Sequence, residues 1–501
     1  MITSSFEDTI VAAATVPGTG AISIIRISGR DAVALADGIV DTPLAGAKGY
    51  SVHFGHVIAS VETDNSSTRD GASNDICEAN GTSLKTVGTE VVDEVIITVY
   101  RAPKSYTGED CVEISCHASS YIVSKIIFLL IEAGARQAEP GEFTQRAFLA
   151  GKMDLTQAEA VADVIASQNA AAHRIAMNQM RGGFSNELQE MRGKLLEMTS
   201  LMELELDFSE EEVEFADRSV LRDLLEQVLT HIECLRESFR LGNAIKNGVP
   251  VAIAGSVNTG KSTLLNALLG EDRAIVSDIP GTTRDTVEDT IIIGGLPFRL
   301  IDTAGIRETS EEIEKIGIQR SFSKISSADI VLGVIDYTKS PEVILSEVKD
   351  LVSNVDLKSQ YLIILLNKAD ILADNKNVRL FNKDVLFTEL QLKNCDHFQI
   401  LEISAKTGFG LSKLKESLKV IEAKRESSAG SVLVANARHF EALGRVALNL
   451  ASVKKSLEVK IPTDLIAQDL REAIYHLGTI TGEISTDEVL GEIFGKFCIG
   501  K

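Results

Sequence analysis

The fold of this chain is decided by the stretch Gly255-Ser256-Val257-Asn258-Thr259-Gly260-Lys261-Ser262, which matches the pattern Gly-x-x-x-x-Gly-Lys-Ser/Thr. An apolar run from Val251 to Ala254 precedes it, and an apolar helix is predicted from Thr263 to Leu269. In such a loop the glycines allow backbone N–H groups to curl around a phosphate at the positive end of the helix. The stretch therefore predicts an α/β domain that binds a nucleotide.

Two further segments extend this site towards Mg²⁺. Within the first loop, Lys261 is expected to neutralise β- and γ-phosphate oxygens, and the Ser262 hydroxyl to ligate Mg²⁺. In Gly281-Thr282-Thr283-Arg284-Asp285, Thr283 is the expected second Mg²⁺ ligand and sensor of the γ-phosphate. In Asp302-Thr303-Ala304-Gly305, Asp302 is expected to bind Mg²⁺ through water, and the Gly305 N–H to meet the γ-phosphate.

The base is predicted from two later motifs, Asn367-Lys368-Ala369-Asp370 and Ser404-Ala405-Lys406. The Asp370 carboxylate can accept from N1–H and the exocyclic amine of guanine, whereas adenine offers neither donor there. The Lys368 stem can lie over the purine plane, and the last motif supplies a backbone N–H for the guanine carbonyl oxygen. Because the motifs follow successive predicted strands in order, the sequence predicts a guanine-nucleotide hydrolase.

The residues that would activate water are unusual. Ras-like enzymes orient the attacking water with a Gln directly after the glycine of the Asp-x-x-Gly motif, and Ile306 stands there. No arginine finger is evident, although Arg284 and Arg307 are nearby. The side-chain oxygen of Asn258 could hold a monovalent cation beside the β-phosphate, or Asn258 could simply stabilise the loop. The residues alone leave both readings open.

Composition restricts the remaining classes of protein. At 501 residues, with about 150 residues per domain, the chain is expected to form three domains. A net charge of −22 argues against broad non-specific nucleic-acid binding, but not against a local basic patch or an RNA-binding partner. The longest apolar stretch, Tyr121 to Ala133, is too short to cross a bilayer, and no signal peptide is evident, so a cytoplasmic protein is expected. The six cysteines form no Cys-x-x-Cys pair, which argues against zinc and disulfides.

The N-terminal part, to about residue 150, is predicted to mix strands and a helix. Alternating or apolar runs predict strands over Ala21 to Ile27, Val91 to Tyr100 and Val112 to Cys116, and a helix over Tyr121 to Ala133. Residues 60–90 are rich in Asn, Ser, Thr, Gly and Asp, and predict a mobile surface loop.

The rest of the chain alternates in character. From Asp154 to Ile245 an apolar stripe at helical spacing predicts helices; it comprises Leu188, Met191, Leu195, Met198 and Leu201. Strand–helix units follow to about Arg425, and helices return after Ser428, with a capping box predicted at Ser485 to Glu488. Because the last part is too small for a core of its own, we expect it to pack against residues 154–245, with the nucleotide domain inserted between them.

The chain resembles the bacterial tRNA modification GTPases of the MnmE (TrmE) family over nearly its whole length. Besides the nucleotide motifs, the matching segments are Asp8 to Ala12, Ile24 to Gly29, Ser105 to Asp110, Pro140 to Phe148 and Phe497 to Lys501. The resemblance implies an N-terminal α+β domain for folate binding and dimerisation, a discontinuous all-α helical domain and an inserted Ras-like P-loop GTPase domain. The implied boundaries are 1–151 for the first domain, 152–247 and 426–501 for the helical domain, and 248–425 for the GTPase domain.

The resemblance also implies a reaction and partners. Family members form homodimers and work with the flavin- and NADH-dependent protein MnmG (GidA), in a heterotetramer or larger complex. Together they place a carboxymethylaminomethyl-type group on C5 of the wobble uridine of certain tRNAs. The one-carbon unit comes from 5-formyl- or 5,10-methylene-tetrahydrofolate, and the implied folate contacts are Arg26, Glu113, Lys152 and Lys501. No membrane partner is implied.

In the nucleotide domain the resemblance implies a K⁺-stimulated GTPase. The implied K⁺ ligands are Asn258, Ser277, Ile279 and Thr282, and the Mg²⁺ ligands are Ser262 and Thr283. The implied catalytic residues are Glu314, Lys261 and Cys498; without the family, Glu314 is one residue of an acidic run, and Cys498 could instead be a terminal anchor. The full set expected to bind GTP is Asn258, Thr259, Gly260, Lys261, Ser262, Thr263, Ser277, Thr282, Thr283, Asp302, Thr303, Ala304, Gly305, Asn367, Lys368, Asp370, Ser404, Ala405 and Lys406.

The sequence departs from the family pattern at three places, one of them the loop at residues 60–90, which is longer than usual, and it leaves two other functions open. Ala118-Ser119 stand where the family has Gly-Gly, and Pro280 lies within the predicted cation-binding loop. A ribosome-assembly GTPase would share the central motifs and the cation dependence, but would usually carry an RNA-binding module or a second GTPase domain. A binding switch, with all modification chemistry in its partner, is the other alternative.

Overall fold

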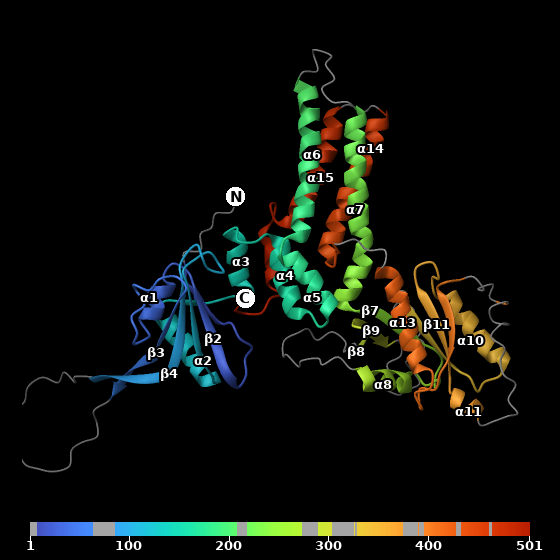
Figure 1. Cartoon of the computed structure of the whole chain (residues 1–501), viewed down its shortest axis with the longest axis horizontal. Helices are drawn as coiled ribbons and strands as arrows, with labels where there is room; N and C mark the ends of the chain where they lie inside the picture. The colour runs from blue at the N-terminus through green and yellow to red at the C-terminus, as the bar shows by residue number, and fades with distance from the viewer. Residues whose placement is uncertain are drawn as a thin grey trace, which may run out of the picture. The chain divides into compact units, whose positions relative to one another are not determined.

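The computed structural model describes residues 8–63, 86–207, 218–272, 289–302, 325, 328–373, 389, 395–426, 432–459 and 463–500 (Figure 1). The chain divides into two compact units. Unit 1 comprises Met1–Ala162 and Thr481–Lys501, and unit 2 comprises Asp163–Ile480. In the described part of the chain, no helix combines the length and the apolar character that crossing a membrane requires.

Unit 1 is built on a six-stranded sheet with the order β3-β4-β5-β2-β1-β6. Its strands are β1 (Ile10–Ala13), β2 (Gly20–Ser28), β3 (Ser51–Thr63), β4 (Thr86–Tyr100), β5 (Cys111–Ala118) and β6 (Arg136–Gln137). Successive side chains of β2 alternate between the two faces of the sheet, and Ile25 and Ile27 share one face. They are buried in the same core as residues of α1 (Ala32–Asp37) and α2 (Ser120–Glu132), so these helices cover that face. Arg26 lies between the two isoleucines and points to the other face of the sheet.

The predicted strands and the helix of this unit are confirmed, but the predicted loop at residues 60–90 is wrong at both ends. β3 continues to Thr63 and β4 begins at Thr86, and these two residues are paired across the hairpin. Polar residues such as Glu62 and Thr89 occupy these strand ends, and because such residues are typical of loops, the composition did not indicate strands there. The centre of the predicted loop, residues 64–85, lies outside the described residues.

The C-terminal residues complete unit 1. Helix α16 (Asp487–Phe494) packs with α4 (Leu155–Ala166) in one apolar cluster, and α3 (Glu142–Leu149) lies beside it. The N-cap of α16 is Thr486, whose hydroxyl accepts from the Val489 N–H at 3.4 Å. The predicted capping box at Ser485 to Glu488 is therefore wrong: with Thr486 at the N-cap, the third helical residue is Val489, whose side chain cannot bond back to the cap.

The segment after α16 folds back against the sheet. Ile499 forms an isolated β-bridge with Pro140, and Phe497 is buried. Gly500 has a φ of 97°, and a Cβ there would collide with the Ala13 carbonyl, so glycine is required for this close approach.

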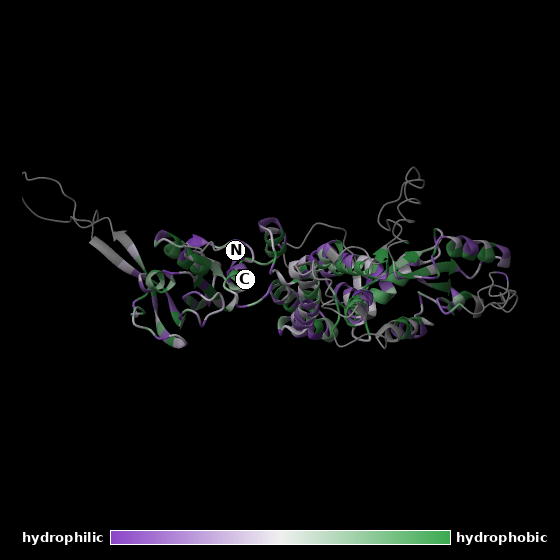
Figure 2. Ribbon diagram, turned by 90° about the horizontal axis from the view of Figure 1, so that it is seen from above, coloured by the Kyte–Doolittle hydropathy of each residue, from purple (hydrophilic) through white to green (hydrophobic). Residues whose placement is uncertain are grey.

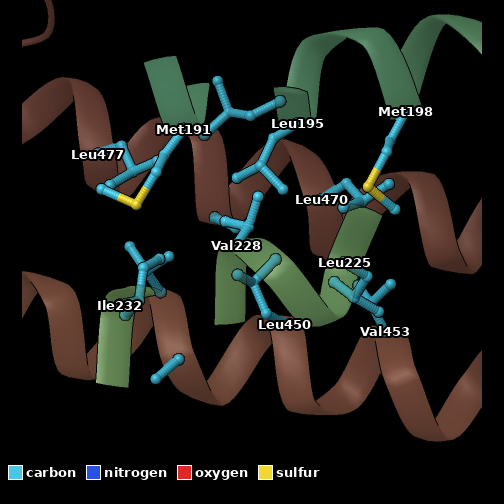
Figure 3. Close-up of a cluster of buried hydrophobic side chains, with 14 of the residues drawn as sticks. Met191, Leu195, Met198, Leu225, Val228, Ile232, Leu450, Val453, Leu470 and Leu477 are labelled. Carbon is cyan, nitrogen blue, oxygen red and sulfur yellow. The ribbon is translucent and has the colours of Figure 1, made fainter. Parts of the chain in front are cut away.

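Unit 2 contains a helical bundle assembled from two separated stretches of chain. Its helices are α5 (Ala170–Met180), α6 (Gly183–Asp207), α7 (Arg218–Asn247), α14 (Ala437–Val459) and α15 (Thr463–Thr481). The predicted stripe of α6 is buried: Met191, Leu195 and Met198 face residues of α7, α14 and α15 in Figure 3. The expected discontinuous helical domain is therefore confirmed, since helices before and after the nucleotide motifs share one core.

The second sheet of unit 2 carries the nucleotide motifs. Its strands are β7 (Val249–Ala254), β8 (Asp289–Ile293), β9 (Leu296–Asp302), β10 (Ile330–Asp336), β11 (Tyr361–Asn367) and β12 (Phe398–Glu402), in the order β12-β11-β10-β7-β9-β8. All pairings are parallel except that of β8 with β9. The described flanking helices are α8 (Lys261–Asp272), α10 (Pro341–Ser353), α11 (Ala369–Ala373) and α13 (Leu411–Glu426).

Burial on both faces explains the continuous apolar runs of these strands. All seven residues of β10 are buried, and the strands carry the hydrophobic colour in Figure 2. β10 and β11 are paired in register so that Asp336 lies beside Asn367 at their carboxyl ends. The sheet therefore brings its polar strand ends to one edge, as the motif order predicted.

Candidate functional site

The phosphate loop runs from Gly255 to Ser262, between β7 and α8. Its glycines are required by neighbouring strands, because a Cβ on Gly255 would meet the Val334 carbonyl and one on Gly260 would meet the Asn367 amide nitrogen. Asn258 has a φ of 62°, a left-handed conformation that asparagine tolerates better than most residues. The loop is thus fixed from outside by β10 and β11.

The phosphate loop combines the ammonium group of Lys261 with the N-terminus of helix α8. Lys261 Nζ donates to the carbonyl oxygens of Gly255, at 2.8 Å, and Ser256, at 2.7 Å. Ser262 is in the first turn of α8, where backbone N–H groups have no partner within the helix. An ammonium group and the positive end of a helix at one place are suited to bind phosphate.

Asn367 connects the phosphate loop to the second predicted base-binding loop. Its side chain is 2% exposed. The amide nitrogen donates to the Thr259 carbonyl at 2.8 Å, and the amide oxygen accepts from the Ala405 N–H at 2.9 Å. One buried side chain therefore joins the loop from Gly255 to Ser262 to the loop of Ala405.

The remaining predicted base-binding residues surround this amide. Asp370 is in the first turn of α11, and Ser404 is buried, with its hydroxyl accepting from the Thr407 N–H at 3.2 Å. Lys406 is exposed. The structure therefore brings the Asn367 and Ser404 motifs together at the edge where the phosphate loop also lies.

Asp336 is a residue of this edge that sequence reasoning missed. Its carboxylate accepts from Lys368 Nζ at 2.6 Å, and from the Thr338 hydroxyl at 2.7 Å. Burial opposes the charge, but the hydrogen bonds from Lys368 and Thr338 outweigh it and hold the pKa of Asp336 below its usual value. A signal was available, because Asp336 ends a strand in the same way as Asp302 and Asn367.

A second cluster of polar groups lies on unit 1. Arg26 and Glu113 are direct partners in the β2–β5 pairing, and their side chains form an ion pair with an Nη2–Oε1 distance of 2.8 Å. The guanidinium lies over the rings of Tyr106 and Phe143, at 5.4 and 5.7 Å from their centroids. Arg26 Nη1 also donates to the Gly500 carbonyl at 3.4 Å, so the C-terminal segment reaches this pair.

The other residues predicted for this cluster are less closely associated with it. Lys152 Nζ donates to the Pro103 carbonyl at 2.8 Å. Cys498 is exposed, and its carbonyl accepts from the Gly141 N–H at 3.4 Å. No described contact joins either residue to the Arg26–Glu113 pair.

Several predicted site residues lie outside the described residues. These are Ser277, Ile279, Thr282, Thr283, Thr303, Ala304, Gly305, Glu314 and Lys501, while Asp302 is described only as the last residue of β9. Their assigned roles stay predictions.

A buried charge network beside the second cluster was also missed. The side chain of Arg146 is 1% exposed. Its guanidinium contacts the carboxylates of Asp8 at 2.8 Å, Glu142 at 2.9 Å and Glu109 at 3.3 Å. The sequence did contain an indication of this network. Glu109, Glu142 and Arg146 lie in two short segments, which were interpreted only as matches to the family. The network attaches α3, against which the C-terminal segment lies, to the start of the chain.

Comparison with known proteins covers the whole chain. The family model described as MnmE helical domain matches residues 155–498, and the one described as GTP-binding protein TrmE N-terminus matches residues 9–152. The tRNA modification GTPase MnmE of Flavobacterium johnsoniae is 46% identical over 99% of this chain and 99% of that protein. The protein of the same name from Bacteroides thetaiotaomicron is also 46% identical, over 99% of this chain and all of that protein.

A solved structure, the G domain of the T. maritima FeoB iron transporter, is 29% identical over 35% of this chain and 98% of that one, with a TM-score of 0.24. The family model over residues 155–498 and the full-length relatives agree with the strand-end motifs of unit 2. The chain therefore belongs to the tRNA modification GTPase MnmE family and is a GTP hydrolase.

Proposed function

We propose that this chain hydrolyses GTP, in response to K⁺, to drive modification of C5 of the wobble uridine in certain tRNAs. It would act as a homodimer in the cytoplasm, together with the flavoprotein MnmG, and add a carboxymethylaminomethyl-type group. The one-carbon unit would come from 5-formyl- or 5,10-methylene-tetrahydrofolate. The domains proposed for this work are 1–151, 152–247 with 426–501, and 248–425.

The observation that carries the proposal is the double contact of Asn367. Because this buried amide holds the Thr259 carbonyl and the Ala405 N–H, phosphate and base sites have a fixed separation. Asp370 would accept from guanine, and Lys261 would neutralise the phosphates. GTP is the nucleotide whose two ends these groups suit.

The donors around the phosphate loop suit the two proposed cations. Mg²⁺ prefers hard oxygen ligands, and Ser262 offers a hydroxyl at the start of α8. Thr283, and Asp302 through water, would complete the set. The left-handed Asn258 lies within the same loop as the phosphate-binding backbone, which supports a role for its oxygen as a K⁺ ligand with Ser277, Ile279 and Thr282. Bound there, the cation would supply positive charge to the transition state, and Glu314 would orient water.

The Arg26–Glu113 pair supports the proposed folate site. A pterin presents an N–H pair that a carboxylate such as Glu113 can bind, while a folate tail carries carboxylates for Arg26, Lys152 and Lys501. Tyr106 beside Arg26 provides an aromatic surface for a flat ring. The proximity of Gly500 to Arg26 supports participation of the C-terminal segment, including Cys498.

The proposal is tested by nucleoside analysis of tRNA from cells lacking this gene. We expect the modified wobble uridine to disappear and to return when the gene is restored. The control is restoration with a Lys261→Ala variant, which should not return it. Unchanged wobble uridine in the deletion strain, together with a defect in ribosome assembly, would replace the proposal with the ribosome-assembly alternative.

A further inference from the structure

Asp336, at the end of β10, belongs to none of the nucleotide motifs but contacts a residue of one of them. Asp336 is the last residue of β10, and its side chain is 12% exposed. One carboxylate oxygen accepts from the Thr338 N–H at 3.0 Å and the Thr338 hydroxyl at 2.7 Å. These bonds fix the orientation of the carboxylate before its other oxygen makes any contact.

That other oxygen binds the lysine of the Asn367 motif. Lys368 Nζ donates to it at 2.6 Å, so the four-carbon stem is held between the backbone of Lys368 and Asp336. Lys368 itself has a φ of 68°, a left-handed conformation that places its Cβ differently from a strand residue. The parallel register of β10 and β11 pairs Asp336 with Asn367, directly before Lys368. The contact therefore follows from the sheet rather than from a flexible loop.

We infer that Asp336 is a positioning residue for guanine binding, which keeps Lys368 extended where its stem can cover the face of the base. This inference rests on the proposed assignment of Asn367 to Asp370 to guanine. A free lysine side chain loses substantial rotamer entropy when it is ordered. With Asp336 present, that ordering precedes nucleotide binding, so the base meets a prepared surface.

Pre-ordering makes a distinctive prediction about the base. The stem covers the ring face, which guanine and hypoxanthine share, whereas Asp370 reads the exocyclic amine that hypoxanthine lacks. Loss of Asp336 should therefore weaken GDP and IDP equally. Loss of Asp370 should change the ratio of the two affinities.

The experiment measures GDP and IDP dissociation constants by titration calorimetry on the full chain. Asp336→Asn should weaken the binding of both nucleotides about five-fold, a size typical of a partly exposed ion pair together with lysine ordering. KM for GTP should rise by the same factor with kcat unchanged, which a general loss of structure would not produce. The matched control is Asp356→Asn, because Asp356 also accepts from a hydroxyl and a backbone N–H, while no hydrogen bond from a lysine ammonium group to it is described.

A double-mutant cycle with Lys368→Met decides whether Asp336 acts through Lys368. We expect Asp336→Asn to cost nothing further in the Lys368→Met background, and additive losses would overturn the inference. Asp370→Asn separately tests the assignment of Asp370 to guanine, since this substitution should change the preferred nucleotide from GDP to XDP. If that exchange fails, the proposed base site is wrong; if it succeeds while Asp336→Asn binds GDP normally, only the positioning role is wrong.

Discussion

Replacing Asn367 with alanine removes both bonds that join the phosphate loop to the loop of Ala405. Each lost bond has a net value of about 1 kcal/mol, and each orphaned buried partner adds a desolvation cost. In the free protein the two loops can relax so that water reaches the Thr259 carbonyl and the Ala405 N–H. Nucleotide binding must then restore the buried arrangement, so the loss falls on affinity.

The expected loss is about 2 to 4 kcal/mol, or roughly a 30- to 1000-fold rise in the GDP dissociation constant. Titration calorimetry with GDP measures it directly. Asn367→Asp keeps an acceptor for the Ala405 N–H but places a buried carboxylate oxygen against the Thr259 carbonyl, so its effect should be at least as large as that of alanine. Asn354→Ala is the control, because this exposed asparagine donates to the Asp350 carbonyl in the same domain. A GDP affinity within three-fold of the parent for Asn367→Ala would refute the reasoning.

Three further outcomes are expected. Glu314→Ala should lower kcat, measured by phosphate release, at least ten-fold, while the affinity for GTP stays within a few-fold of the parent. A near-normal kcat would mean that another residue orients the attacking water. Exchanging K⁺ for Na⁺ should slow hydrolysis, and Asn258→Ala should abolish that difference. Burial opposes the charge of Glu142, but hydrogen bonds from Arg136 and Arg146 keep its pKa below the ordinary value, so this stabilisation is complete above about pH 4.5 and is lost as pH falls through the lowered pKa. The protection of the β1 amides against exchange should therefore fall below that pH, and Arg146→Met should weaken the dependence, because Arg136 still donates to Glu142.

Most of the nucleotide edge was predictable, because its strands are buried on both faces and end at polar motifs. β8 was missed although its hairpin has a strong signal: Gly294-Gly295, both with positive φ, is a two-residue turn typical of antiparallel strands. β8 is only five residues long, too short for its three consecutive isoleucines to show the alternation of a strand.

Contacts that depend on register could not be predicted. Asp336 meets Lys368 only because β10 and β11 are adjacent and in phase, and sequence order does not contain that fact. The Arg26–Glu113 pair similarly depends on β2 and β5 being neighbours, 87 residues apart in the chain. Glu142 is four residues from Arg146 on α3, a local spacing, whereas Asp8 and Glu109 come from distant segments, so the sequence indicates only one of the three contacts.

Unit 1 is formed by the first and the last part of the chain, which affects its folding during synthesis. Its first segment, Met1–Ala162, leaves the ribosome before Asp163–Ile480 has been synthesised, and Thr481–Lys501 arrives only afterwards. At about 5 to 20 residues per second this delay lasts tens of seconds. During it, the surfaces that later receive Phe497 and Gly500 stay uncovered, and Arg26 has no C-terminal partner. The nascent domain therefore passes through an interval in which its own tail cannot yet cover these surfaces.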